Sequence, residues 1–152
     1  MTEIKQRTIG SSVSLSGNGL HTGSAVNLVF RPADVNHGIV FLRTDIGPDA
    51  RVEADALLVS DTSRGTTLER DGIKVVTVEH VMAAAAGLQI DNLIVELDGP
   101  ELPIMDGSSI AFVRALQDAG IVEQDAPREF FEVREPIRFY HEEKDCEFIA
   151  LP

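Results

Sequence analysis

The first fifty residues carry short runs of apolar and polar side chains that read as β-strands. The runs TEIKQRTIG, SVSLSG, AVNLVFRPA and HGIVFLRTD are rich in β-branched and aromatic residues, and Gly, Asn, Asp and Pro separate them. Residues 51–76 continue in shorter pieces, where Asp71-Gly72 between two extendable runs is typical of a hairpin turn. The pattern predicts a strand-rich first half that ends in a small β insertion.

Helical signals begin at residue 78. In VEHVMAAAAGL (78–88), four consecutive alanines favour a helix, Thr77 can cap its start and Gly87 can end it. The apolar run NLIVELDG (92–99) predicts a strand that is buried on both faces or packed under a helix. A second helix is expected over SIAFVRALQDAG (109–120), with one apolar stripe formed by the positions Ile110, Val113, Leu116 and Gln117. The tail after Arg128 predicts two further strands around a polar turn.

Many strands with two central helices predict an α+β fold. We expect a two-layer sandwich in which a mainly antiparallel sheet carries two helices on one face, plus the small β insertion. A chain of 152 residues fits one domain that buries roughly two-thirds of its unfolded surface, so 1–152 is predicted to be a single domain. Because the sequence stops in strand-like residues, we expect this domain to be part of a longer protein.

Composition narrows the possible partners and the compartment. The formal net charge is −12, with 25 acidic against 13 basic residues, which argues against nucleic-acid binding. One or two local Lys or Arg side chains can still hold a diphosphate. No run of 18 apolar residues occurs, and the start lacks the organisation of a signal peptide. Together with a single cysteine, Cys146, these features predict a cytoplasmic protein without a transmembrane segment.

The strongest chemical candidates are Glu79 and His80, which are adjacent at the start of the first predicted helix. Such a pair can serve one site, with the imidazole on a metal and the carboxylate on its water. Taken alone, the pair also fits a structural role, in which Glu79 complements the helix dipole and His80 is satisfied in the core or by solvent.

Three loops offer further candidates, each with a structural alternative. The glycine-dense loop 17–23 and the polar run 61–66 can line a ligand or simply make turns, and Asp106 ahead of Gly-Ser fits a cap or an Asx-turn better than a catalytic role. No Gly-x-Ser-x-Gly, Cys-x-x-Cys or His-Glu-x-x-His motif is present. Serine hydrolases, zinc ribbons and ordinary zincins therefore lack sequence support.

Four segments together resemble one family. GLHTG (19–23), VEH (78–80), IDN (90–92) and PELPIMDGSS (100–109) occur in the order and spacing of the UDP-3-O-acyl-N-acetylglucosamine deacetylases, zinc amidohydrolases of lipid A synthesis, and the similarity runs from Lys5 to the end. The resemblance implies two similar α+β domains with the active site between them. It identifies this chain as the first domain and a C-terminal domain of the same polypeptide as its partner.

The resemblance also implies residue roles. His80 would be one of three zinc ligands and Glu79 the general base that acts on the zinc-bound water. Leu20, His21 and Thr62 would lie near the substrate, UDP-3-O-acyl-N-acetylglucosamine, and Lys144 would meet its diphosphate.

The other two zinc ligands of the family, a histidine and an aspartate on a helix of the second domain, have no match here. His37 and His141 are assigned to the surface, and the isolated chain is expected to be inactive. One alternative is a natural single-domain, non-catalytic relative that acts as a binding or regulatory module. Another is a face-to-face homodimer in which each copy lends His80 to a shared metal.

Overall fold

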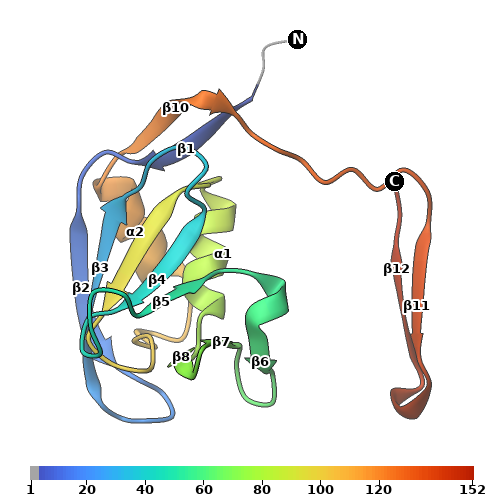
Figure 1. The fold of residues 1–152 in the computed structure, drawn as a ribbon, viewed down its shortest axis with the longest axis horizontal. Helices are drawn as coiled ribbons and strands as arrows, with labels where there is room; N and C mark the ends of the chain where they lie inside the picture. The colour runs from blue at the N-terminus through green and yellow to red at the C-terminus, as the bar shows by residue number, and fades with distance from the viewer. Residues whose placement is uncertain (1–3) are drawn as a thin grey trace.

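The main sheet has five strands and is covered by helices on one face. A computed structural model describes residues 4–152, so the predicted strand residues 2 and 3 lie outside the described part. The strand order is β2 (Val13–Asn18), β3 (Ala25–Pro32), β9 (Leu93–Leu97), β4 (Ile39–Arg43) and β5 (Arg51–Glu53). Neighbours are antiparallel except β4 and β9, which run parallel (Figure 1).

Alternation along the central strands places one face of the sheet in the core. Leu93, Val95 and Leu97 of β9 are buried, whereas Ile94 and Glu96 point to the opposite, partly exposed face. Helices α1 (Glu79–Gly87) and α2 (Ile110–Asp118) contribute to the same core as the buried face of the sheet. The α+β prediction is therefore confirmed, and β9 follows the second of its two predicted modes, packing under the helices.

Two predicted helix details are wrong. Thr77 does not cap α1: the N-cap is Val78, without a side-chain hydrogen bond, and Thr77 has a left-handed backbone with φ 63°. The predicted apolar stripe of α2 included Ile110 and Gln117, but both are exposed. The face that packs instead carries Phe112, Ala115 and Leu116, because the aromatic ring of Phe112 fits edge-on against Phe30 of β3.

The predicted β insertion is confirmed. It consists of the short η1 turn (Ala56–Leu58) and three antiparallel strands, β6 (Val59–Asp61), β7 (Thr67–Arg70) and β8 (Ile73–Val75). The β7–β8 turn uses Asp71 and Gly72, both with positive φ (51° and 81°), as a two-residue hairpin of this kind requires. The insertion lies beside the N-terminal end of α1 (Figure 1).

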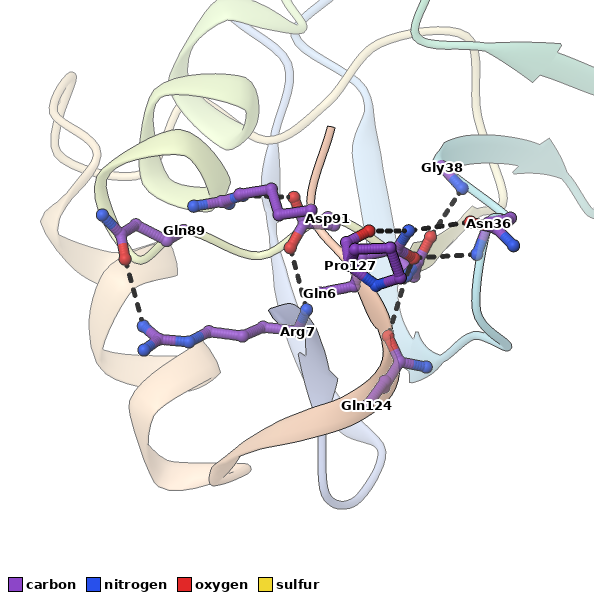
Figure 2. A network of polar contacts seen from close by, with 10 residues as sticks. Gln6, Arg7, Asn36, Gly38, Gln89, Asp91, Gln124 and Pro127 are labelled. Atoms are coloured by element: carbon purple, nitrogen blue, oxygen red, sulfur yellow. Dashed lines mark hydrogen bonds and ion pairs between the residues drawn. The ribbon is translucent and has the colours of Figure 1, made fainter. Parts of the chain in front are cut away.

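A polar network connects the first and last strands of the body, by which we mean the described chain before the tail hairpin. β1 (Lys5–Ile9) pairs with β10 (Ile121–Pro127), and the amide of Gln6 bonds Asn36 and the Pro127 carbonyl (Figure 2). Asn92, which is 1% exposed, accepts from the Gly38 N–H and donates to Gln6 and Gln124. The network lies at the start of β9, where it holds β1, β10 and the loop before β4 in place.

The predicted tail strands form a hairpin that stands apart from the body. β11 (Ile137–His141) and β12 (Cys146–Ala150) pair across the η2 turn (Glu142–Lys144), and Figure 1 shows them well away from the sheet and helices. Within the described residues, every side-chain hydrogen bond and ion pair of 132–152 joins two residues of that segment. The expectation of one domain over 1–152 stays a prediction.

Neither α1 nor α2 is long and apolar enough to cross a membrane.

Candidate functional site

Glu79 and His80 open helix α1, and the carboxylate of Glu79 is held by a neighbouring loop. The backbone N–H of Thr66 donates to Oε2 of Glu79 at 2.9 Å, and the N–H of Val78 donates back to the Thr66 carbonyl at 3.2 Å. A Cβ on Gly65 would lie only 3.1 Å from Oε1 of Glu79. The absence of a side chain at position 65 therefore lets this loop approach the carboxylate closely.

A second loop reaches the same place through His21. Its ring Nε2 lies 3.1 Å from the carbonyl oxygen of Arg64, next to Gly65. Leu20 is 58% exposed and precedes His21 in this loop. The structure thus brings the predicted residues of loop 17–23 and of run 61–66 together with Glu79.

An open cavity of about 380 Å³ lies between these two loops and the small sheet. Arg64 and Lys74 supply cationic groups to it, and Lys74 also forms an ion pair with Glu69 at 3.4 Å. Thr62 is exposed and lies in the chain between two lining residues. The cavity is lined by His21, Ser60, Asp61, Ser63, Arg64, Gly65, Thr67, Glu69, Lys74 and Val76.

Beneath this cavity lies a carboxylate that the sequence analysis did not single out. Glu101 is 1% exposed and follows directly after the turn that ends β9. Its oxygens accept from the N–H of His21 (2.9 Å), the N–H of Thr22 (2.8 Å) and the hydroxyl of Thr77 (3.1 Å). Glu101 therefore joins the His21 loop to the residue that leads into α1.

The ionisation of Glu101 follows from these contacts. Burial is the largest influence and raises the pKa of Glu101, but the hydrogen bonds from His21, Thr22 and Thr77 together outweigh burial, so the pKa lies below its ordinary value of 4.5. Glu101 is thus a buried carboxylate that stays anionic at neutral pH. A buried charge with this many donors fixes the groups that donate to it.

Asp106 has the structural role that its context predicted. Its Oδ1 accepts from the backbone N–H of Ser108 at 3.0 Å and from the Ser108 hydroxyl at 2.8 Å. These bonds lower the pKa of Asp106, and the Ser108 hydroxyl in turn accepts from the N–H of Ile110 at 3.2 Å. The Asx-turn alternative is confirmed, and Asp106 shapes the entry to α2.

Comparison with known proteins assigns the family. The profile of UDP-3-O-acyl N-acetylglycosamine deacetylases matches residues 6–152. The chain belongs to this deacetylase family. It is 53% identical over 136 residues to the UDP-3-O-acyl-N-acetylglucosamine deacetylase of Myxococcus xanthus and 49% identical over 146 residues to that of Chromohalobacter salexigens.

The matched relatives of the deacetylase family are longer than this chain. The alignment takes in 90% of the chain but 43% of the Myxococcus xanthus protein, and 96% of the chain but 48% of the Chromohalobacter salexigens protein. A third relative, the bifunctional enzyme LpxC/FabZ of Chlorobaculum tepidum, is 48% identical over 149 residues, which are 32% of its length. The chain therefore spans about half the length, or less, of the curated relatives it matches.

The family resemblance implies zinc, and the described residues fit it only in part. Between residues 4 and 152, no group of three or more His, Cys, Asp or Glu side chains is arranged to hold a metal ion. His80, half-buried in the first turn of α1, can offer one imidazole ligand. A catalytic zinc usually has three protein ligands, so the others would have to come from outside these residues.

The remaining candidates lie away from α1. His37 is half-buried, with Nδ1 3.2 Å from the Gly38 carbonyl in the loop before β4. His141 ends β11 and is half-buried beside Phe139. Lys144 is exposed in the η2 turn of the hairpin, apart from the body (Figure 1). In this structure Lys144 is not brought near the other predicted substrate residues, and its role stays a prediction.

Proposed function

We propose that this chain is the N-terminal half of a zinc-dependent, cytoplasmic deacetylase that removes acetate from UDP-3-O-acyl-N-acetylglucosamine in lipid A synthesis. The observation that carries the proposal is the first turn of α1, where a carboxylate and an imidazole are adjacent and Glu79 is oriented by the Thr66 N–H next to a cavity. Family membership and the activity by which the relatives are named indicate the substrate.

The chemistry assigns different tasks to the two residues. Zinc, when bound by His80 and ligands from elsewhere in the polypeptide, supplies Lewis acidity that lowers the pKa of a water molecule to about 7. Glu79 takes a proton from the attacking water as the C–O bond forms, and passes it to the departing amine nitrogen as the C–N bond breaks. The free glucosamine amine and acetic acid result, and the acid becomes acetate by releasing its remaining proton to solvent.

The surroundings suit Glu79 for this task. Its carboxylate lies in the first turn of α1, at the positive end of the helix dipole. Oε2 accepts from the Thr66 N–H and Oε1 lies on the Gly65 side, and we propose that Oε1 meets the attacking water. Leu20, His21 and Thr62 would contact the substrate across the cavity, and Lys144 would have to approach it in the complete protein.

The exposed hairpin supports a role for further polypeptide. Apolar side chains on both β11 and β12 are open to solvent, among them Phe139 and Phe148, which are 58% and 63% exposed. Isolated two-stranded hairpins are at best marginally stable in water, and apolar patches of this kind mark interaction sites. We propose that the C-terminal half, by which the relatives exceed this chain, covers the hairpin.

The test is a chimaera in which this chain is followed by the remaining half of the Myxococcus xanthus relative. We expect it to release acetate from UDP-3-O-acyl-N-acetylglucosamine. Glu79→Gln should retain zinc and lower kcat by about 10²- to 10⁴-fold, the usual contribution of a positioned general base. His80→Ala should lose zinc.

Glu123→Gln is the matched control, because Glu123 is an exposed glutamate on β10. Full activity of Glu79→Gln would show that Glu79 is not the general base. A zinc-loaded but inactive chimaera whose spectra match a folded protein would favour the binding or regulatory role instead.

A further inference from the structure

A path made of hydrogen bonds and short chain segments leads from buried Glu101 to Glu79. Glu101 accepts from the backbone N–H groups of His21 and Thr22. The side chain of the same His21 lies 3.1 Å from the Arg64 carbonyl. Two residues further, the Thr66 N–H donates to Glu79 at 2.9 Å. Two loops thus connect the two carboxylates, through these hydrogen bonds and the short chain segments between them.

A second, shorter path joins the same two residues. The Thr77 hydroxyl donates to Oε1 of Glu101, and Thr77 lies two residues before Glu79. Its left-handed backbone, φ 63°, is unfavourable for a β-branched residue and needs support from its surroundings. The hydrogen bond to Glu101 provides such support directly at the entry to α1.

The packing around Glu101 leaves no room for another arrangement. A Cβ on Gly19 would overlap the Glu101 carboxylate and the Thr22 hydroxyl. The backbone next to Glu101 is also fixed, because Leu102 N–H donates to the Val76 carbonyl at 3.1 Å and Val76 N–H to the Pro100 carbonyl at 2.9 Å. The backbone beside Glu101 is therefore held by hydrogen bonds, and loop 19–22 packs closely against the carboxylate.

We infer that Glu101 is a positioning residue for Glu79: it fixes the His21 loop and Thr77, and through them the 64–66 loop whose N–H orients the Glu79 carboxylate. This inference rests on the proposed function for its catalytic meaning, because Glu79 acts as a base that must be positioned only if that function holds. Its structural content is independent of catalysis. Glu101 itself does not line the cavity.

Amide hydrogen exchange of the chain 1–152 tests the inference without an activity assay. We expect the Thr66 N–H to exchange roughly tenfold faster in Glu101→Gln, because the amide NH2 that replaces one carboxylate oxygen cannot accept from the donors that face it. A hydrogen bond to a charged group is worth about that factor. Glu79→Ala gives the reference for direct loss of the acceptor.

Asp91→Asn is the matched control. Asp91 also accepts a backbone N–H, that of Arg7 at 2.8 Å, and it forms an ion pair with Arg128, but it lies beyond the C-terminal end of α1 (Figure 2). We expect this variant to lose stability while exchange at Thr66, measured relative to global unfolding, stays unchanged. Equal acceleration at Thr66 in both variants would mean general loosening and would overturn the inference.

His21→Ala keeps the test decisive if Glu101→Gln does not fold. It removes the contact with the Arg64 carbonyl but leaves the backbone N–H groups that bind Glu101. Faster exchange at Thr66, with the Thr22 N–H still protected, supports the path. Unchanged exchange at Thr66 in His21→Ala overturns the loop path.

The chimaera separates this inference from the proposed function. Acceleration at Thr66 together with an inactive wild-type chimaera would leave the link from Glu101 to Glu79 intact and refute the deacetylase proposal. An active chimaera whose Glu101→Gln variant keeps both kcat and Thr66 protection would refute the positioning role alone. The expected result is a kcat lowered up to about 10²-fold, the effect of a displacement of roughly 1 Å at a reacting group.

Discussion

The hydroxyl of Thr77 lies 3.1 Å from Oε1 of Glu101, and this pair joins the entry of α1 to the turn that follows β9. Thr77 is 2% exposed and has φ 63°, so a threonine occupies a backbone conformation that favours glycine. The side chain that makes the conformation costly also makes the bond that stabilises it.

Substitutions at Thr77 should separate the hydroxyl from the backbone. Thr77→Val keeps the shape but removes a donor from a buried carboxylate, and we expect a loss of about 1.5–3 kcal/mol in the free energy of unfolding. Thr77→Ser retains the hydroxyl and should lose less than about 1 kcal/mol. Urea denaturation measures both. Equal losses in the two variants would show that the hydroxyl does not contribute to the free energy of unfolding.

The stability of the chain should depend on pH through Glu101. Because the pKa of Glu101 in the folded state lies below its ordinary value of 4.5, the carboxylate stabilises the fold above that pH. This contribution is lost as the pH falls through the lower, folded-state pKa. We expect Glu101→Gln to be less stable by about 2–4 kcal/mol at neutral pH, and the difference from wild type to shrink as the pH falls below 4.5 and through the folded-state pKa.

Gln124→Ala is the control for this pH dependence. Gln124 bonds the Asn92 amide and the Ala33 carbonyl but does not titrate. Its loss should lower the stability by a similar amount at every pH, so that its curve runs parallel to that of the wild type. A parallel curve for Glu101→Gln would contradict the role of the buried charge.

The fold could be predicted because its signals are local. Alternation marks the strands, Asp71-Gly72 marks the hairpin turn, and the four alanines before Gly87 mark α1. Asp106 could be assigned from Gly-Ser after it, since an Asx-turn needs only neighbours in the chain. Each of these features is decided within a few residues, so the sequence is sufficient.

The arrangement of the site could not be predicted in the same way. Glu101 stands in a Pro-rich turn among apolar neighbours, and nothing near it in the sequence indicates that His21, Thr22 and Thr77 donate to it. The cap expected from Thr77 is wrong for the same reason, because the distant carboxylate competes for its hydroxyl. Tertiary contacts override a local preference here.

The IDN segment is one of the segments that carry the family resemblance, and two of its residues have a structural role here. Asn92 hydrogen-bonds to Gly38, Gln6 and Gln124. Asp91 accepts from the Arg7 N–H and pairs with Arg128. Both residues precede the start of β9, whereas Glu101 follows its end. Asn92→Ala should therefore cost about 2–3 kcal/mol of stability by leaving buried partners unsatisfied. Asn27→Ala, an exposed control on β3, should lose much less.

Zinc binding by the chain alone should be weak. With His80 as a single imidazole ligand, the affinity should fall far short of the roughly 10–16 kcal/mol of complete structural sites, and His80→Ala should abolish what remains. Calorimetric titration measures it, with His37→Ala as the control. Tight binding that is lost in His80→Ala and accompanied by dimerisation would favour the shared site between two copies.

Removal of the hairpin should leave the body folded. Since the side-chain bonds found for residues 132–152 stay within that segment, a chain ending at Glu129 should unfold with a free energy within about 1 kcal/mol of the full chain. The comparison is made by urea denaturation of the two chains. A larger loss would mean that the hairpin stabilises the body.

The position of β9 in the sheet determines the order in which parts of the molecule can fold. β9 pairs with β3 on one side and with β4 on the other, and both partners precede it by long stretches of chain. Such distant pairings form late, because the entropy of closing a long loop is lost before the contacts repay it. Glu101 follows the turn after β9, so the loops around the cavity acquire their anchor only when the centre of the sheet is in place. The site therefore forms together with the core of the sheet and not before it.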